Sequence, residues 1–169
     1  MRVGRGPAGG SLIVKSVELS RHGVFFVWLG GRRDGGYQQT LYRIAHGRRT
    51  MLERRHYRGT SPYVRNISTP SVVGRDVFFT TTIPRGRSSG RSVLVRISLR
   101  SGRRATAPPP APFDRIGGAA SITRTKRRFL VETYTGDPGT GSGDGACAPE
   151  TASPCATLLN LGALRFRTR

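Results

Sequence analysis

The two cysteines lie close together in the longest loop that the sequence predicts. Cys147 and Cys155 are eight positions apart in a stretch rich in glycine, proline and polar residues. A disulfide between them would close a short loop and reduce the conformational entropy of the unfolded segment. Two buried free thiols are the alternative, but the segment is too polar to bury them. The pair therefore predicts a disulfide in an oxidising, extracytoplasmic compartment.

One stretch matches the Gly-x-Ser-x-Gly pattern of hydrolase nucleophiles. It is Gly86-Arg87-Ser88-Ser89-Gly90. That chemistry needs a strand before the serine and a helix after it, so that the hydroxyl is held on a strained turn. Here an apolar strand pattern follows and no helix is expected. We therefore interpret the stretch as a hairpin loop.

The three histidines do not form a metal-binding or nucleophilic pattern. His22, His46 and His56 fall in or near turns, without regular spacing and without a cysteine nearby. A zinc site groups its ligands tetrahedrally, and a Cys-His nucleophile needs the two side chains within hydrogen-bonding reach. Surface positions are the simpler interpretation.

The carboxylates are too few and too scattered to assign acid–base chemistry. The nine are Glu18, Asp34, Glu53, Asp76, Asp114, Glu132, Asp137, Asp144 and Glu150. Glu132 shares a strand with apolar residues and is either a buried acid or a partner of an arginine. Asp137 and Asp144 flank glycines as in calcium loops, but the EF-hand spacing is absent and a flexible loop is the alternative. We predict no catalytic, cofactor or metal site, and no enzyme activity.

The net charge of +20 comes almost entirely from arginine. Only Lys15 and Lys126 are lysines among the 29 basic residues, so 27 are arginines, and they are scattered over the whole chain. Such an excess is typical either of a GC-rich coding bias with a solvated surface or of a selected polyanion site. Weak, nonspecific binding to nucleic acid or acidic surfaces at low salt is expected in both cases.

The aromatic residues are not interleaved with basic ones, as they are on many nucleic-acid-binding sheets. Phe25, Phe26, Trp28, Phe78 and Phe79 lie in unbroken apolar runs, which favours core packing. Because residues 24–29 are apolar at consecutive positions, we expect that strand to be covered on both faces.

Targeting signals are absent from the sequence as given. There is no apolar run of about 18 residues, so no membrane-spanning helix is predicted. The basic amino terminus is not followed by the apolar segment of a secretory signal. Apart from the cysteine pair, the sequence leaves the compartment undetermined.

Short strand patterns recur at an interval near 50 residues. Val77-Phe78-Phe79 has counterparts in Val24-Phe25-Phe26, 53 residues earlier, and in Phe129-Leu130-Val131, 52 residues later. The apolar strands 41–44 and 94–97 each follow their triplet by the same 17 residues, and 157–161 takes that place in the third copy. A fixed period of this length, made of short strands, is typical of a propeller or a related array.

These strand–turn–strand units carry a family resemblance. The segments LYRI…GRR and VLVRISLRSGRR resemble blades of β-propeller proteins of the TolB-like and quinoprotein-like kind. In those families the first turn of a blade often reads Ser-Pro-Asp-Gly, and here Ser20 and Gly23 keep that frame. The resemblance implies a repeat architecture and not a particular active site.

We therefore predict an all-β fold, a β-propeller-like array of about three four-stranded antiparallel blades. The units would span about 11–55, 69–107 and 117–168 of a domain at 11–169, after a flexible arm at 1–10. Propellers have about four to eight blades, so we expect an incomplete ring, part of a longer propeller, with self-association through open end blades.

The predicted function is a non-catalytic interaction or structural module with an unknown protein partner. The first alternative is binding of a polyanion, nucleic acid or acidic glycan, through the Arg-rich surface. The second is the propeller part of a secreted hydrolase or dehydrogenase whose catalytic residues lie outside this chain.

Overall fold

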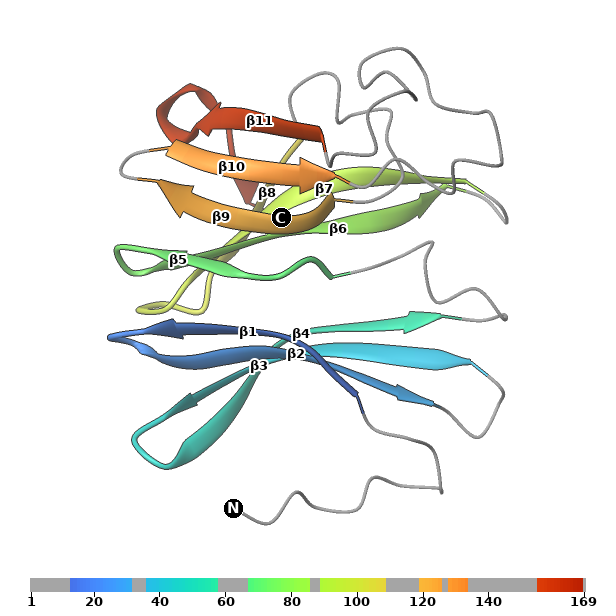
Figure 1. Cartoon of the computed structure of the whole chain (residues 1–169), viewed down its shortest axis with the longest axis vertical. Helices are drawn as coiled ribbons and strands as arrows, with labels where there is room; N and C mark the ends of the chain where they lie inside the picture. The colour runs from blue at the N-terminus through green and yellow to red at the C-terminus, as the bar shows by residue number, and fades with distance from the viewer. Residues whose placement is uncertain are drawn as a thin grey trace.

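The computed structural model describes residues 13–31, 36–57, 67–85, 89–108, 119–125, 128–133 and 155–168. These segments form antiparallel β-sheets, with one short 3-10 helix at Leu161–Ala163 (Figure 1). The prediction of an all-β fold is confirmed. The strands fall into three sheets.

The first sheet is a four-stranded meander in the order β1-β2-β3-β4. Its strands are β1 (Ile13–Ser20), β2 (Gly23–Gly31), β3 (Tyr37–Ala45) and β4 (Arg48–Tyr57). The β3–β4 turn has positive φ at both His46 and Gly47, as in the tight hairpin turns that match the twist of antiparallel strands. Gly23 begins β2 with φ +124°, and a Cβ there would collide with the carbonyl oxygen of Ile44. Glycine is therefore required at this turn.

The second sheet has five strands in the order β12-β8-β7-β6-β5. They are β5 (Ser71–Val73), β6 (Asp76–Arg85), β7 (Ser89–Ser98), β8 (Arg104–Ala107) and β12 (Arg167–Thr168). The third sheet has the order β11-β10-β9. Its strands are β9 (Ala119–Thr125), β10 (Arg128–Thr133) and β11 (Cys155–Asn160).

The third sheet has three described strands, not the four that were predicted for each blade. The sequence pattern of residues 164–167 predicts the last strand of the third unit, but Leu161–Ala163 form a 3-10 turn and the last strand, β12, pairs with β8. Phe166 then packs edge-on against Phe78, with ring centroids 6.0 Å apart, and the Arg96 guanidinium lies 4.7 Å from the Phe166 ring centroid. These contacts hold the end of the chain on the second sheet, and β12 pairs with backbone groups along part of the edge of β8.

The second sheet lies between the other two (Figure 1). In Figure 1 β5 lies between β1 and β9, and the close backbone contacts of β9 are with β5 and β6. Side chains alternate across β6: Val77 and Phe79 point toward the first sheet, whereas Phe78 points to the opposite face, and all three are buried. The middle sheet is thus covered on both faces.

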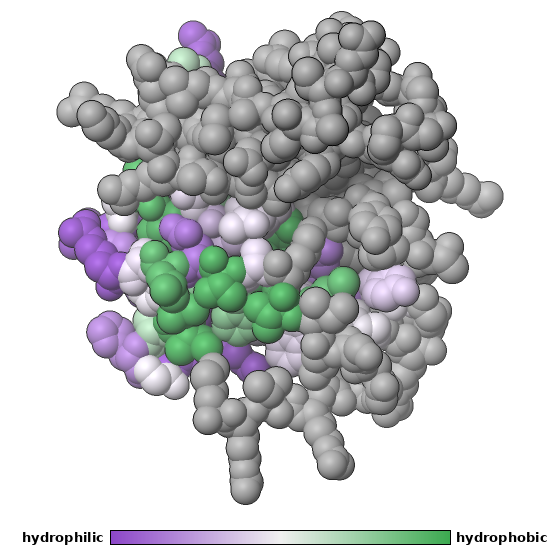
Figure 2. Space-filling view, in the orientation of Figure 1, coloured by the Kyte–Doolittle hydropathy of each residue, from purple (hydrophilic) through white to green (hydrophobic). Residues whose placement is uncertain are grey.

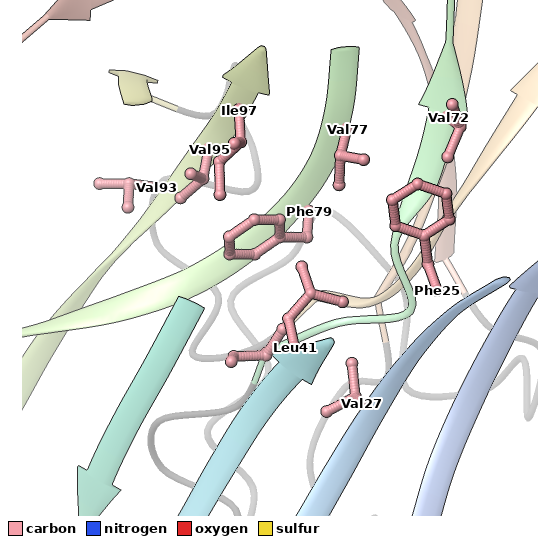
Figure 3. Close-up of a cluster of buried hydrophobic side chains, with 10 residues drawn as sticks. Phe25, Val27, Leu41, Val72, Val77, Phe79, Val93, Val95 and Ile97 are labelled. Atoms are coloured by element: carbon pink, nitrogen blue, oxygen red, sulfur yellow. The ribbon is translucent and has the colours of Figure 1, made fainter. Parts of the chain in front are cut away.

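The main core fills the space between the first and second sheets (Figure 3). Phe25, Val27 and Leu41 from the first sheet meet side chains of β5, β6 and β7, with Ile67 completing the cluster. The buried Gln39 side chain accepts a hydrogen bond from the Ile67 N–H at 2.7 Å. This bond fixes the segment that leads into the second sheet, because an unpaired buried N–H is costly.

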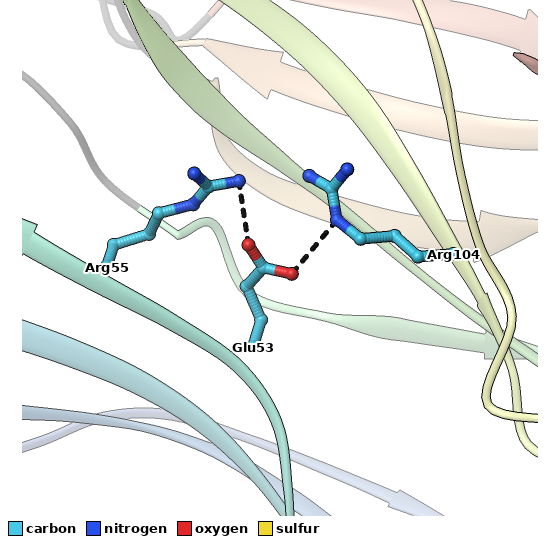
Figure 4. Close-up of polar contacts among 3 residues, drawn as sticks. All are labelled: Glu53, Arg55 and Arg104. Carbon is cyan, nitrogen blue, oxygen red and sulfur yellow. Dashed lines mark hydrogen bonds and ion pairs between the residues drawn. The ribbon is translucent and has the colours of Figure 1, made fainter. Parts of the chain in front are cut away.

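An ion-pair cluster also joins the two sheets (Figure 4). The Glu53 carboxylate of β4 contacts Arg55 Nη2 at 2.7 Å and Arg104 Nε of β8 at 3.1 Å. The Glu53 side chain is only 10% exposed. The one described carboxylate on β4 is therefore engaged by two arginines.

Candidate interaction face

The first sheet has one face against the core and one face turned away from it. Register places Val14 opposite Trp28, Val17 opposite Phe26 and Leu19 opposite Val24, on the side away from Phe25 and Val27. We call this side the outer face. Its apolar and basic side chains are Val14, Val17, Leu19, Val24, Phe26, Trp28, Tyr42, Ile44, Arg49, Met51 and Arg54.

The outer face is open to solvent over its aliphatic part. Leu19 is 73% exposed, Val14 59%, Val17 53% and Met51 48%. Figure 2 shows apolar surface gathered over the region of β1 and β2. Single exposed apolar residues are ordinary, but a contiguous patch on one sheet is typical of a binding surface.

An aromatic group forms the middle of the outer face. The rings of Phe26 and Tyr42 are stacked with centroids 5.4 Å apart, and Trp28 lies 5.8 Å from Tyr42. The Arg49 guanidinium lies 5.0 Å from the Tyr42 ring centroid, within cation–π range. These side chains are half-buried by one another and by the sheet, so the patch is pre-ordered before any partner binds.

The charge of the outer face is of one sign. Arg49 and Arg54 lie on the outer face, because they pair in register with Ile44 and Thr40, and both arginines are exposed. No Asp or Glu occupies the outer face in the described ranges: Glu18 pairs in register with Phe25 and Glu53 with Leu41, both on the core side. The face is therefore apolar at its centre and positive along β4.

One cysteine of the predicted disulfide lies outside the described residues. Cys155 is the first residue of β11 and pairs in register with Thr133, whereas Cys147 falls in a segment that the structure does not describe. The bond between them stays a prediction. Asp137 and Asp144 also lie outside the described residues.

The remaining sequence candidates do not converge. Ser89 and Gly90 begin β7, a strand antiparallel to β6, and residues 86–88 of the Gly-x-Ser-x-Gly match are not described. His22 lies in the β1–β2 turn and His46 in the β3–β4 turn, at one end of the first sheet. His56 lies at the other end of that sheet, near the end of β4. Within the described ranges, no group of three or more His, Cys, Asp or Glu side chains could hold a metal ion.

The expectation that residues 24–29 are covered on both faces is wrong for one face. Phe25 and Val27 are fully buried, but Phe26 and Trp28 are only half-buried on the outer face. The assignment of all five aromatics to the core therefore fails at these two positions. The sequence feature that could have indicated an apolar outer face is the apolar side of the preceding strand, formed by Val14, Val17 and Leu19.

Comparisons with known proteins add no relative to this picture. No protein-family model matches the chain, and neither a curated protein nor a solved structure shows significant similarity to it. In the part of the chain that the structure describes, no helix has the length and apolarity needed to cross a bilayer.

Proposed function

We propose that this chain is a non-catalytic, protein-binding module built from β-propeller-like units, and that it binds through the outer face of its first sheet. The propeller-like arrangement is supported by the position of the recurring triplets. Residues 24–26, 77–79 and 129–131 lie on β2, β6 and β10, the second strand contributed by each unit. Apart from the added strand β12 in the second sheet, each sheet is also a meander of consecutive strands, as in a propeller blade.

The observation that carries the binding role is the exposure of the aliphatic side chains Leu19, Val14, Val17 and Met51. Burying one such side chain fully stabilises a complex by about 1.5–3 kcal/mol. Association costs roughly 4–15 kcal/mol in lost translational and rotational freedom. Several of these side chains must therefore be covered together, which their position on one face of one sheet permits.

A site-specific crosslink tests this role. A photoreactive benzophenone side chain at position 19 should give a discrete protein adduct in an extract of the source organism. The same group at position 100, an exposed turn residue of the second sheet, serves as the control. Adding Val17→Asp should abolish the adduct at position 19. Identical adducts at both positions, or none at position 19, would contradict the proposal.

Polyanion binding is a second candidate, favoured by the arginines exposed on the hairpin turns. Arg48, Arg75, Arg100 and Arg103 are exposed at or beside turns of the first two sheets, and the last three lie together at one end of the second sheet, where the Leu99 N–H donates to the Arg75 carbonyl and the Ser98 N–H to the Arg103 carbonyl. Such a distribution supports nonspecific attraction to phosphates or sulfates. Heparin affinity measured against salt should then fall steeply, and single Arg→Gln changes at these turns should each have a small, similar effect.

A further inference from the structure

We infer that the outer face binds an acidic protein surface, one with an apolar centre and carboxylates placed against Arg49 and Arg54. This inference rests on the proposed function and names the chemistry of the partner. It follows from three properties of the outer face: its composition, its single sign of charge and its size.

The composition of the outer face matches that of protein–protein interface cores. Such cores are enriched in Trp, Tyr, Phe, Met and Arg, and depleted in Lys, Glu, Asp, Ser and Ala. The outer face carries Trp28, Tyr42, Phe26 and Met51 together with two arginines. Trp, Tyr and Arg are also the residues that most often dominate binding energy.

The arginines determine the charge of the partner. A docked surface that covers the apolar centre also desolvates Arg49, whose guanidinium already lies over Tyr42. A buried charge left without a counter-charge is strongly unfavourable, whereas a carboxylate can accept two parallel hydrogen bonds from a guanidinium. Within the described ranges the outer face carries arginines and no carboxylate, and a carboxylate on the partner would complement them.

Charge also disfavours a second copy of this chain as the partner. Two outer faces docked with one β4 over the other would bring arginines toward arginines, in a protein whose net charge is already +20. Like charges facing each other in an interface cost several kcal/mol.

A single-stranded nucleic acid fits the outer face less well than a protein does. Base-stacking platforms need free aromatic faces. Here Tyr42 is engaged by Phe26, Trp28 and Arg49, and the most exposed side chains are aliphatic. Aliphatic groups cover apolar protein surface well but give little specific contact to bases and phosphates.

The dimensions of the first sheet suit a protein interface. Four strands at about 4.8 Å spacing and eight to ten residues at about 3.4 Å rise project roughly 500–600 Å². This area is below the roughly 800 Å² per partner of a standard interface and corresponds to a small protein interface.

The test uses peptide probes and charge reversal. The probe is a short, fluorescently labelled peptide in which glutamates alternate with leucine and phenylalanine, and a second probe replaces every glutamate by lysine. The glutamate probe should bind more tightly by fluorescence anisotropy. The double variant Arg49→Glu with Arg54→Glu should weaken binding of the glutamate probe by about tenfold or more, and should then bind the lysine probe more tightly than the glutamate probe. The matched control, Arg75→Glu with Arg100→Glu, has the same net charge and should change it less than about twofold.

Other outcomes overturn the inference in distinguishable ways. If both probes bind equally and Val17→Asp abolishes both, the face binds proteins but does not select acidic ones. If Val17→Asp leaves glutamate-probe binding unchanged, the outer face is not the site and the proposed function fails too. If oligothymidylate displaces the glutamate probe, and the double variant Arg49→Glu with Arg54→Glu no longer binds oligothymidylate, the partner is a nucleic acid. A dimer that Val17→Asp dissociates in sedimentation would identify a second copy.

Discussion

Glu53 of β4 and Arg104 of β8 form an ion pair between the first and second sheets, with Glu53 Oε2 3.1 Å from Arg104 Nε. The second oxygen of the same carboxylate contacts Arg55 at 2.7 Å. The Arg104 side chain is 31% exposed, so solvent still screens part of the interaction. The pair joins β4 to β8, beside the apolar cluster that packs between their sheets.

We predict that Glu53→Gln destabilises the fold by about 1–2 kcal/mol, because two arginines lose their shared carboxylate while remaining partly buried. A double-mutant cycle with Arg104→Gln, followed by urea unfolding, should give a coupling energy of about 0.5–1.5 kcal/mol. A coupling near zero would mean that the pair adds nothing between the sheets. Arg100→Gln, at an exposed turn, is the control and should be close to neutral.

Gly23→Ala should be among the most damaging single substitutions at a turn. The residue has φ +124°, and a methyl group there would meet the carbonyl oxygen of Ile44. We expect a loss of about 2–3 kcal/mol or more in the free energy of unfolding, since both strain and displacement of β3 contribute. Gly74→Ala is the matched control: its φ is +59° with open space around the Cβ, so only the smaller conformational cost of about 1 kcal/mol applies. Equal losses at the two positions would contradict the steric argument.

Phe166→Ala should release β12 from the second sheet. The ring loses its contacts with Phe78 and Arg96, and because Phe166 is half-buried we expect about 1–2 kcal/mol, less than for a fully buried phenylalanine. Hydrogen exchange should accelerate at the β8 amides near Ala105 and Thr106, which face β12. Arg165→Ala, at an exposed neighbouring position, should leave that exchange unchanged.

Most strand positions could be predicted from sequence because their signals are local. The expected strands at 24–29, 41–44 and 94–97 lie within β2, β3 and β7, and His46 lies in a turn, as expected. Alternating apolar residues and a glycine able to adopt positive φ determine such hairpins without reference to the rest of the chain.

The outer face could not be predicted because it depends on which sheets meet. The residues of β2 are apolar on both sides, and this pattern alone does not tell whether Phe26 and Trp28 contact another sheet or solvent. Only the stacking order, with the second sheet in the middle, leaves that side of the first sheet open. The apolar pattern was correctly assigned to a strand, but its coverage is a tertiary property.

The destination of the last strand is a tertiary property as well. Its local pattern placed a strand near 164–167, next to its neighbour in sequence, whereas β12 joins β8 instead. The choice depends on Phe166 reaching Phe78, a residue far away along the chain. No local propensity encodes such a contact.

Enclosure of the second sheet on both faces has a consequence for how the protein opens. The buried residues 77–81 of β6 and 93–95 of β7 lie in the middle sheet, so we expect their amides to exchange more slowly than those of β1. Among the described strands, the outermost strand β1 pairs with β2 alone, and Val14, Val17 and Leu19 on it are exposed, so it can fray while the interior remains intact. A partner that covers the outer face would therefore rigidify β1, whereas the aromatic centre on β2 and β3 is already ordered.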